Sequence, residues 1–473
     1  MRLLTFLLCF ALAPCVAGAG DAERLLDIVE KSALPLESFS LLALELGENG
    51  PVTRLSLHPH VAKNPASTTK LITAAVTLRE IPSGTRFSTR VLADGPVDNG
   101  VLRGNLILQG GGDPSFVSET LWLLVNRLRQ VGLTAVEGDI IVDDSYFDTV
   151  LIDPGRDTKR SEHAYDAPIS AMSFNWNSAQ ILIRPGRLGT PPQVLVEPAS
   201  DYFTVDNRAT TAPGSSIAQL KLLRRPQPDA GGDMLVVSGS LGVHAGEYDT
   251  RRNITQPALW SGLNLKHYLG YMDIPVTGEV VRSSSPVTAR ELASVDGRPV
   301  EQLVIDMNKV SSNFIAEMLT KAIAARRSAP GTMSAGLDIM QEYMASLGVD
   351  PSEYLLVNPA GLTYTNRLSA NALVRVLHDA MQDFRIAPEF TASLPIAGLD
   401  GTLERRMRDT PAQGWVRAKT GYVEGSVSLA GFAQSADGNP IVYAFLYNGP
   451  ASAQKVRALY DELSTRLVST GDR

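Results

Sequence analysis

Three short motifs with reactive or hydrogen-bonding side chains lie far apart along this chain. They are Ser67-Thr68-Thr69-Lys70, Ser311-Ser312-Asn313 and Lys419-Thr420-Gly421. More than half of the chain separates the first motif from the second. If the three motifs form one site, the segment between them must be an inserted domain or a pair of inserted domains, and the chain on either side must fold together.

The two ends of the chain have the sequence patterns of an α+β unit. Helical spacing or strand-like patterns occur at residues 21–32, 67–80 and 453–468 (helices) and at residues 39–46, 52–57, 414–420, 426–434 and 441–447 (strands). These segments predict one antiparallel sheet with helices on its faces. Residues 86–285 contain many short strand-like segments separated by Gly and Pro turns, which predicts mainly β insertions.

The first residues have the pattern of a secretory signal peptide. Met1-Arg2 is followed by an apolar run, residues 3–13, and then by Ala17-Gly18-Ala19, so cleavage after Ala19 is expected. The run is shorter than the roughly 20 residues that span a membrane. The alternative is a lipoprotein signal ending at Cys15, which the preceding proline disfavours. Cys9 and Cys15 are the two cysteines of the chain, so the mature protein is expected to lack disulfides and catalytic thiols.

The composition is that of an ordinary globular protein, with 473 residues, 44% hydrophobic and 20% charged, and a net charge of −7. This acidity argues against nucleic-acid binding, which needs a basic face. The apolar stripe of residues 453–468 favours a helix packed on the sheet over a membrane-surface helix, although peripheral membrane contact stays open. The close histidine pair His58-Pro59-His60 suits a turn better than a metal site, so no metal or cofactor is expected.

Ser67 and Lys70 have the spacing of a nucleophile and its base on one helical face. A serine hydroxyl needs a neighbouring group to take its proton, and an amine can do so only when it is neutral. Burial and a second cation, for which Lys419 is the candidate, would lower the pKa of Lys70. A surface helix with a capping serine is the alternative explanation for this motif taken alone.

The other two motifs supply further polar groups. Ser311 could relay a proton to the leaving group, and Asn313 could hold a substrate amide, although both residue types are also common helix caps. Lys419 and Thr420 could bind a substrate carboxylate. Gly421 would let a substrate lie against this strand, and the backbone N–H of Tyr422 would then form an oxyanion hole with that of Ser67 (a plain strand-end turn is the alternative).

The ordered set S-x-x-K, S-x-N and K-T-G is typical of penicillin-binding proteins and serine β-lactamases. Further stretches extend the match: Gly104-Asn105-Leu106 through Ser115, Leu394-Pro395-Ile396 through Leu403, and Ser428-Leu429-Ala430-Gly431-Phe432. On these residues the chain resembles the penicillin-binding protein 4-type D-alanyl-D-alanine carboxypeptidases/endopeptidases, low-molecular-mass class C enzymes of the bacterial periplasm. The likeness covers nearly the whole mature chain.

This resemblance implies a domain organisation. Residues 20–85 and 285–473 would form a serine β-lactamase/transpeptidase-like catalytic domain I. Residues 86–177 and 253–284 would form an inserted domain II, and residues 178–252 a domain III nested within it, after the signal of residues 1–19.

It also implies roles and partners. Ser67 would be acylated with Lys70 as its base, and the polar groups of the second and third motifs would complete the site. The substrates would be peptidoglycan stem peptides ending in D-Ala-D-Ala, or D,D-crosslinks. β-Lactam antibiotics would trap Ser67 as inhibitors.

Two positions concern the pocket for a diaminopimelate side chain. Asp143 matches the acidic residue that would bind the amine of that side chain. The segment from Asn358 reads Asn-Pro-Ala-Gly-Leu-Thr-Tyr, so that Tyr364 stands where the family has an arginine for the carboxylate. Either Arg367 substitutes or the stem-peptide preference is altered.

Two rival functions share these motifs. A serine β-lactamase needs fast deacylation, usually through a glutamate near an E-x-x-L-N segment, and this chain has no such segment. A catalytically silent cell-wall-binding protein of the same fold is disfavoured by the intact motif residues.

Overall fold

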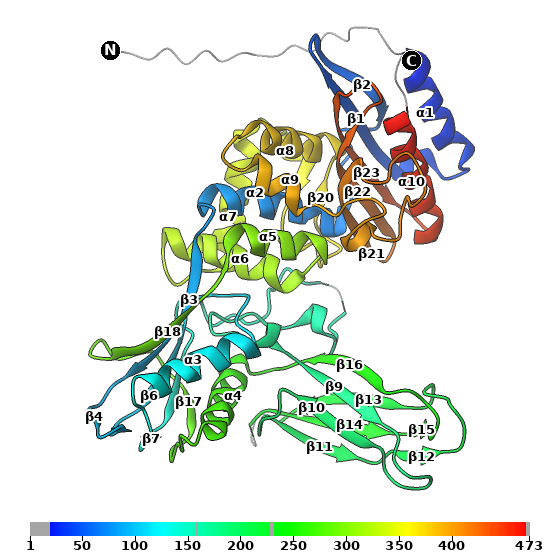
Figure 1. Cartoon of the computed structure of the whole chain (residues 1–473). Coiled ribbons are helices and arrows are strands. Elements are labelled where there is room, and N and C mark those ends of the chain that lie inside the picture. The colour runs from blue at the N-terminus through cyan, green and yellow to red at the C-terminus, as the bar shows by residue number, and fades with distance from the viewer. Residues whose placement is uncertain (1–18, 158, 228–230, 470–473) are drawn as a thin grey trace, which may run out of the picture.

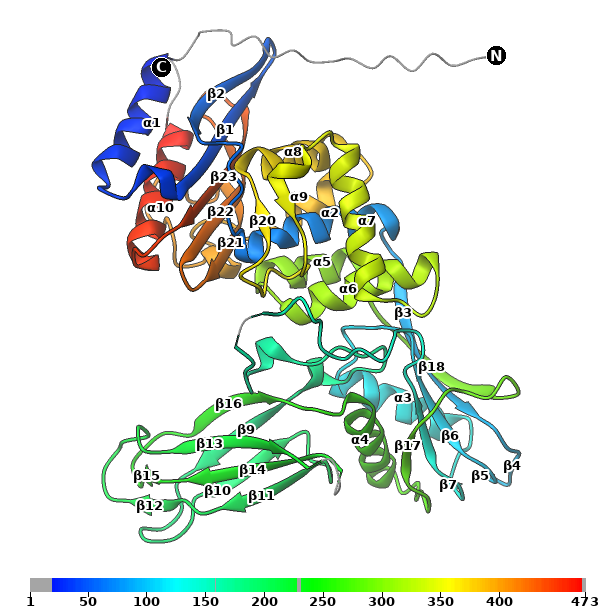
Figure 2. The same ribbon diagram turned by 180° about the vertical axis from the view of Figure 1, so that it is seen from behind.

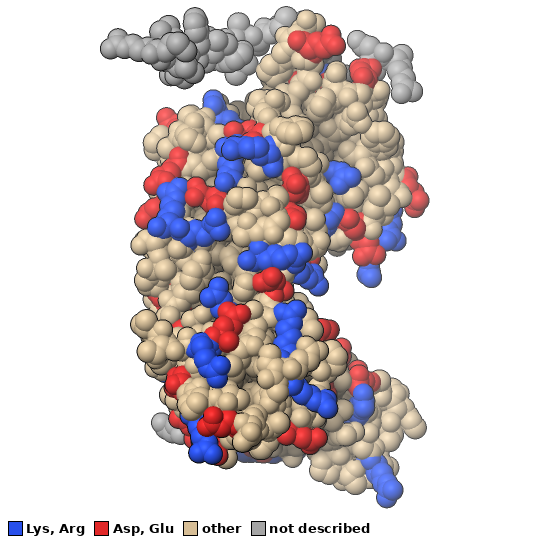
Figure 3. Space-filling view, turned by 60° about the vertical axis from the view of Figure 1, so that its left-hand side comes forward, with Lys and Arg blue, Asp and Glu red and all other residues tan. Residues whose placement is uncertain are grey.

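The computed structural model describes residues 19–157, 159–227 and 231–469. Figures 1 and 2 show an upper unit, built from both ends of the chain, and a lower unit, built from its middle, which are joined through β3 (Arg86–Ala93) and β18 (Arg290–Pro299). Figure 3 shows the surface hollowed on one side between the two units, with acidic and basic side chains interspersed over the face in view.

The sheet of the upper unit is antiparallel and has the strand order β2–β1–β23–β22–β21. Its strands are β1 (Phe39–Gly47), β2 (Gly50–Leu57), β21 (Val416–Val423), β22 (Ser426–Gln434) and β23 (Pro440–Asn448). The pairing of β1 with β23 joins the first strands of the chain to the last. This sheet confirms the α+β architecture predicted from the two chain ends.

Helices cover both faces of this sheet. They are α1 (Ala19–Lys31) and α10 (Ala453–Ser469) on one face, and α2 (Lys70–Glu80), α5 (Val300–Lys309), α6 (Asn313–Arg327), α7 (Met333–Ser346), α8 (Ala370–Gln382) and α9 (Ala387–Ser393) on the other (Figure 1). Leu25 and Val29 of α1 pack with Leu459 and Leu463 of α10 in one buried cluster against the sheet. The C-terminal apolar stripe therefore packs on the sheet, as its spacing predicted.

The lower unit contains a second sheet with the order β17–β8–β6–β3–β18 and several smaller sheets. Its strands are β4 (Val97–Asp98), β5 (Val101–Leu102), β6 (Leu106–Gly110), β7 (Ala135–Val136), β8 (Ile140–Asp143), β9 (Ser178–Arg184), β10 (Gln193–Glu197), β11 (Phe203–Asn207), β12 (Thr210–Ala212), β13 (Lys221–Pro226), β14 (Asp233–Ser238), β15 (Ser240–Gly242), β16 (Tyr248–Asn253) and β17 (Val280–Arg282), and its helices are α3 (Ser118–Gln130) and α4 (Pro257–Tyr271). Short elements complete the chain: the 3₁₀ helices η1 (Leu36–Ser38), η2 (Ala66–Thr69), η3 (Ala164–Asp166), η4 (Asn175–Asn177), η5 (Pro351–Glu353) and η6 (Gly401–Leu403), and the strands β19 (Tyr354–Leu355) and β20 (Arg367–Leu368).

The insertion is mainly β, as predicted, and it also contains α3, which buries Leu121, Leu124, Val125 and Leu128 against its sheet. One detail differs from the expected domain boundary. β18 pairs with β3 along the insertion's sheet, although the predicted boundary at residue 285 assigns it to the catalytic domain. The three-domain division stays a proposal, and this pairing favours a boundary near residue 299.

The predicted signal segment, including Cys9 and Cys15, lies outside the described residues except for Ala19, where α1 begins. Within the part of the chain that the structure describes, no helix combines the length and apolar character needed to cross a bilayer.

Candidate active site

Ser67 lies in η2, at the start of the helical segment that continues as α2. The sequence predicts one helix over residues 67–80, whereas the structure begins α2 at Lys70 after a tighter 3₁₀ turn. The turn is entered through Ala66, which has a φ of 47° and whose N–H donates to Asn64 Oδ1 at 2.8 Å. A left-handed non-glycine residue is strained, and such strain is concentrated at functional sites.

Lys70 is fully buried, and its amine contacts three oxygen atoms. Nζ donates to Asn313 Oδ1 at 2.7 Å and to the carbonyl oxygen of Ala360 at 2.6 Å, and it lies 3.1 Å from Ser67 Oγ. The amide group of Asn313 has a defined orientation, because its Nδ2 donates to the carbonyl oxygen of Tyr165 at 3.1 Å. A neutral amine has two N–H donors and one lone pair. With both donors used by the amide and the carbonyl, the lone pair is left to accept the Ser67 hydroxyl proton.

The surroundings of Lys70 favour this neutral form. Burial lowers its pKa well below the usual value, and the positive charge of Lys419 lowers it further, whereas Glu317 acts in the opposite direction. Burial also lowers the pKa of Lys419, to about 7. The predicted effect of burial and a second cation on Lys70 is therefore present in the structure.

Ser311 connects the second motif to the third. It has a φ of 59°, and its Oγ accepts a hydrogen bond from Lys419 Nζ at 2.9 Å. Lys419 Nζ also donates to the carbonyl oxygen of Thr420 at 2.8 Å. The hydroxyl of Thr420 donates to Thr402 Oγ1 at 2.8 Å. The three motifs thus meet in one hydrogen-bonded site, as the hypothesis of a shared site required.

Gly421 of the strand β21 lies close to the backbone of Ser67. A Cβ at this position would lie 2.0 Å from Ser428 Oγ, 2.6 Å from the carbonyl oxygen of Pro65 and 3.1 Å from the Ser67 nitrogen. Any larger residue would push the strand away from the first turn of η2, so glycine is required for this contact. The backbone of Tyr422 follows directly, and its role as an oxyanion donor stays a prediction.

Around Ser67 there is an open cavity of about 370 Å³. Its lining consists of Ser67, Ser311, Thr402, Arg406, Thr420, Gly421, Tyr422, Val427, Ser428 and Arg457. No Asp or Glu belongs to this lining, as far as the described residues go. The lining therefore contains no carboxylate that could act as a general base, which leaves the buried lysines Lys70 and Lys419 as the candidates.

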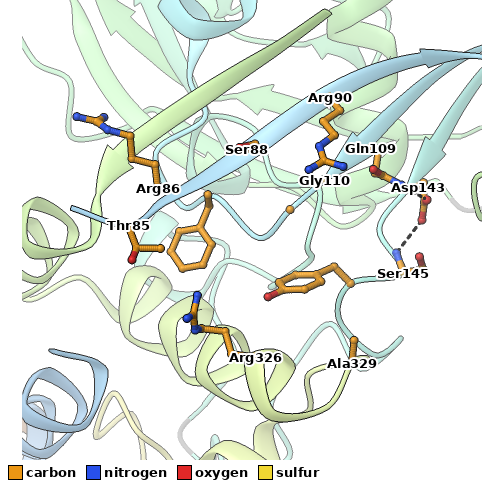
Figure 4. A pocket seen from close by; sticks show the side chains of 13 residues that line it. Thr85, Arg86, Ser88, Arg90, Gln109, Gly110, Asp143, Ser145, Arg326 and Ala329 are labelled. Atoms are coloured by element: carbon orange, nitrogen blue, oxygen red, sulfur yellow. Dashed lines mark hydrogen bonds between the residues drawn. The ribbon is translucent and has the colours of Figure 1, made fainter. Parts of the chain in front are cut away.

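Asp143 is not in this cavity. It lines a separate hollow of about 500 Å³ between β3 and the end of α6, which Figure 4 shows together with Arg90 and Arg326. Burial raises the pKa of Asp143, but hydrogen bonds from Ser145, Ser285 and Gln109 outweigh burial and lower it to about 2. The carboxylate is thus held by neighbours in its own unit, and the structure does not bring it to Ser67.

A buried network of ion pairs and hydrogen bonds lies next to Lys70. Arg156 Nη2 lies 2.6 Å from Glu317 Oε2, and its Nη1 lies 2.9 Å from Asp166 Oδ1. Glu317 also accepts from Asn358 Nδ2 at 3.0 Å, and the Asn358 side chain accepts from the backbone N–H of Ala360, whose carbonyl oxygen accepts from Lys70. The network joins the inserted unit to α6 and, through Asn358 and Ala360, to Lys70.

We expect Arg156→Met to destabilise the protein strongly, because it leaves the buried carboxylate of Glu317 without the guanidinium that pairs with it, and leaves Asp166 with Arg160 alone. Breaking a buried pair costs about 3–5 kcal/mol, whereas an exposed pair contributes about 0–1 kcal/mol. Arg327, which pairs with Glu80 and Glu342 at the surface, gives the matched control Arg327→Met. Guanidinium unfolding measures both variants, and equal losses would contradict a structural role for the buried network.

Sequence reasoning missed several members of this site. Thr402, which binds the third motif, and Tyr165, which orients Asn313, were given no role, although Thr402 lies in a family-like stretch. The carbonyl oxygen of Ala360 has no side-chain signal that a motif could show. Within the described residues, no three His, Cys, Asp or Glu side chains gather in a way that could hold a metal ion.

A model of the D-Ala-D-Ala carboxypeptidase 3 (S13) family matches residues 24–467. The chain belongs to this family. The resemblance identified from the three motifs is thereby confirmed, and members of the S13 family are serine peptidases.

Similar proteins agree with this S13 assignment. The D-alanyl-D-alanine carboxypeptidase of Actinomadura sp. (strain R39) is 31% identical over 419 residues, which are 85% of this chain and 76% of that protein. The D-alanyl-D-alanine carboxypeptidase DacB of Haemophilus influenzae is 24% identical over 395 residues, or 81% of this chain and 80% of its own. The crystal structure of penicillin binding protein 4 (dacB) from Haemophilus influenzae superposes with a TM-score of 0.80 at 22% identity, covering 93% of this S13 chain and 99% of that chain. This superposition confirms the predicted fold class.

Proposed function

We propose that this S13 peptidase acts through an acyl-enzyme on Ser67, removing D-alanine from peptidoglycan stem peptides that end in D-Ala-D-Ala and cleaving D,D-crosslinks. The observation that carries the proposal is the geometry at Lys70. Lys70 Nζ lies within hydrogen-bond distance of Asn313 Oδ1, of the Ala360 carbonyl oxygen and, at 3.1 Å, of Ser67 Oγ. Burial and the charge of Lys419 lower the pKa of Lys70, and the neutral amine can donate to the first two oxygens and accept the proton of the third.

In the acylation step, Lys70 Nζ takes the hydroxyl proton while Ser67 Oγ attacks the carbonyl carbon of the penultimate D-alanine. The negative charge on the carbonyl oxygen is stabilised by the N–H groups of Ser67 and Tyr422. The peptide C–N bond then breaks, and the leaving amine takes a proton from the Ser311 hydroxyl, which lies 2.9 Å from Lys419 Nζ and is reprotonated from the lysines.

In the deacylation step, water takes the place of the departed amine. Lys70 accepts a proton from this water, the hydroxide adds to the ester carbon, and Ser67 leaves with its proton restored. Hydrolysis thus uses the same base twice, which agrees with a cavity that has no carboxylate in its described lining.

The specificity for a free carboxylate next to the scissile bond comes from the third motif. Lys419 and Thr420, with Thr402 bonded to Thr420, present a cation and hydroxyl groups on the β21 side of Ser67. Both a terminal D-alanine and the D-centre of a crosslinked diamino acid have a carboxylate at this position. One site can therefore serve carboxypeptidase and endopeptidase reactions.

The proposal is tested by incubating the protein with purified muropeptides and following their masses. We expect pentapeptides to lose one alanine and crosslinked dimers to become monomers. Unchanged muropeptides, with a protein that still reacts with penicillin, would contradict peptidoglycan as the substrate.

The fate of a β-lactam distinguishes two other functions from the proposed one. Rapid turnover of nitrocefin would show a serine β-lactamase, and an inert mixture would show a catalytically silent wall-binding protein. In a penicilloyl-enzyme the leaving nitrogen stays attached and occupies the place that water takes after D-alanine departs, and the described lining has no carboxylate to activate water from another side; both favour slow deacylation, and hence inhibition by β-lactams rather than their turnover.

The stem-peptide preference depends on residues 364–367. Tyr364 is 43% exposed, and Arg367 Nη1 donates to the carbonyl oxygens of Tyr364 and Asn366 at 2.6 and 2.8 Å. Because Arg367 is directed to this backbone, we expect stems with free and amidated diaminopimelate to be hydrolysed at similar rates, with Arg367→Ala leaving the ratio unchanged. A preference for the free acid that disappears in Arg367→Ala would show that Arg367 replaces the family arginine.

Function on the cell wall places the protein outside the cytoplasmic membrane. Together with the predicted signal of residues 1–19, this supports export to the bacterial periplasm. Fractionation of the expressing cells tests this location.

A further inference from the structure

A groove beside the catalytic cavity contains an exposed tryptophan. The groove has a volume of about 500 Å³, and its walls include Tyr165 and Trp176 from the inserted unit and Val310 and Ser311 from the upper unit. Ser311 also lines the cavity of Ser67, so the two hollows meet at this residue. A long substrate bound at Ser67 has this groove as its neighbouring surface.

The backbone around Trp176 is strained. Asn175, Trp176 and Asn177 have consecutive φ values of 49°, 54° and 50°. Asparagine tolerates this left-handed region, but a bulky aromatic residue rarely adopts it. Strain of this kind persists where the surrounding structure enforces it, and it is concentrated at binding and catalytic sites.

The two asparagines enforce this turn. Asn175 exchanges hydrogen bonds with Ser118, and Asn177 Nδ2 donates to the carbonyl oxygen of Pro168 and to Ser173 Oγ. The guanidinium of Arg251 lies over one face of the Trp176 indole, 5.8 Å from the ring centroid, which leaves the opposite face for a ligand to stack on. Hydrogen bonds to neighbouring residues thus hold the turn, and its strained conformation places the indole ring at the groove surface.

The groove is lined by exposed apolar side chains together with charged ones. Trp176 is 36%, Tyr165 52% and Val310 71% exposed. Arg298 is paired with Asp306 at 2.8 Å and Lys309 with Asp400 at 2.6 Å, whereas Arg251 lies beside Trp176. Gathered exposed apolar groups indicate a binding surface.

We propose that this groove binds a sugar ring of the glycan strand that carries the stem peptide, with Trp176 as the stacking platform. A sugar ring presents C–H groups on its face and hydroxyl groups at its edge, which match an aromatic face with a polar rim. The four residues of a stem between the scissile bond and the sugar would span about 14 Å as ordinary extended residues, and the γ-glutamyl link and the lactyl ether add a few ångströms, so the sugar must lie near the catalytic cavity. The inference rests on the function proposed above.

The test compares two substrates that share one pentapeptide, one free and one attached to its N-acetylated disaccharide. We expect the wild-type kcat/KM to be about tenfold higher for the disaccharide form, the effect of one good stacking contact. Trp176→Asn removes the ring and places a residue that tolerates positive φ. It should abolish this preference, while the melting temperature stays unchanged or rises and the rates with free pentapeptide and benzylpenicillin stay within about twofold.

Two further variants complete the experiment. Trp176→Phe keeps an aromatic face and should retain most of the preference, and Trp122→Ala removes a tryptophan that is 53% exposed on α3 and should retain all of it. A wild-type protein without preference, or a Trp176→Asn variant that slows both substrates equally, would overturn the proposal. Failure of the proposed function looks different, because the wild type would then release no D-alanine from either substrate, whether or not it reacts with penicillin.

Discussion

Replacing Ser67 by alanine is expected to abolish the covalent capture of benzylpenicillin. The hydroxyl oxygen of Ser67 is the group that Lys70 Nζ faces at 3.1 Å, and the cavity around it is open to a ligand. Removing the nucleophile of a serine enzyme lowers the rate by on the order of 10⁴-fold or more. The intact mass after brief exposure should show a penicilloyl adduct on the wild type and none on Ser67→Ala.

Ser346→Ala serves as the control, because Ser346 is an exposed serine on α7 whose hydroxyl bonds to a backbone carbonyl. It should form the adduct as the wild type does. An adduct on Ser67→Ala would show that another residue is the nucleophile and would refute the proposed mechanism.

Replacing Lys70 by methionine is expected to slow acylation by about 10²–10⁴-fold, the usual contribution of a well-placed general base. Methionine has a similar length but cannot accept the proton of Ser67 Oγ. The acylation rate constant with a chromogenic cephalosporin measures the loss, and Lys455→Met on the exposed side of α10 provides the control. A Lys70→Met variant that acylates at the wild-type rate would exclude Lys70 as the base.

The pH dependence of acylation follows from the two lysines. The rate rises with pH as Lys70 loses its proton, and it falls above about pH 7 as Lys419, whose pKa burial lowers to about 7, loses the charge that binds the carboxylate. In Lys419→Met, the charge that helps to lower the pKa of Lys70 is absent. The rising limb should therefore move to higher pH, and an unmoved limb would show that the two amines are not coupled.

The features that follow from the sequence by itself are local. The spacing of Ser67 and Lys70 places them on one helical face, and the alternating and apolar runs at the two chain ends specify strands and helices whatever lies between them. The order of the three motifs, together with the long separation of Ser67 from Ser311, requires an insertion. The inferences about helices and strands succeed because their periodicity is a short-range property of the chain.

Only the tertiary structure decided which distant groups meet. Asp143 shows this most clearly, because a matching position in a short stretch does not determine which hollow a carboxylate faces, and the residue lies away from Ser67. The backbone carbonyl of Ala360 completes the site without any sequence signal, and the hydroxyl of Thr402 lies in a family-like stretch whose pattern does not tell which group it binds. Such contacts depend on how separate elements pack against one another, and packing is a property of the whole fold that no local pattern contains.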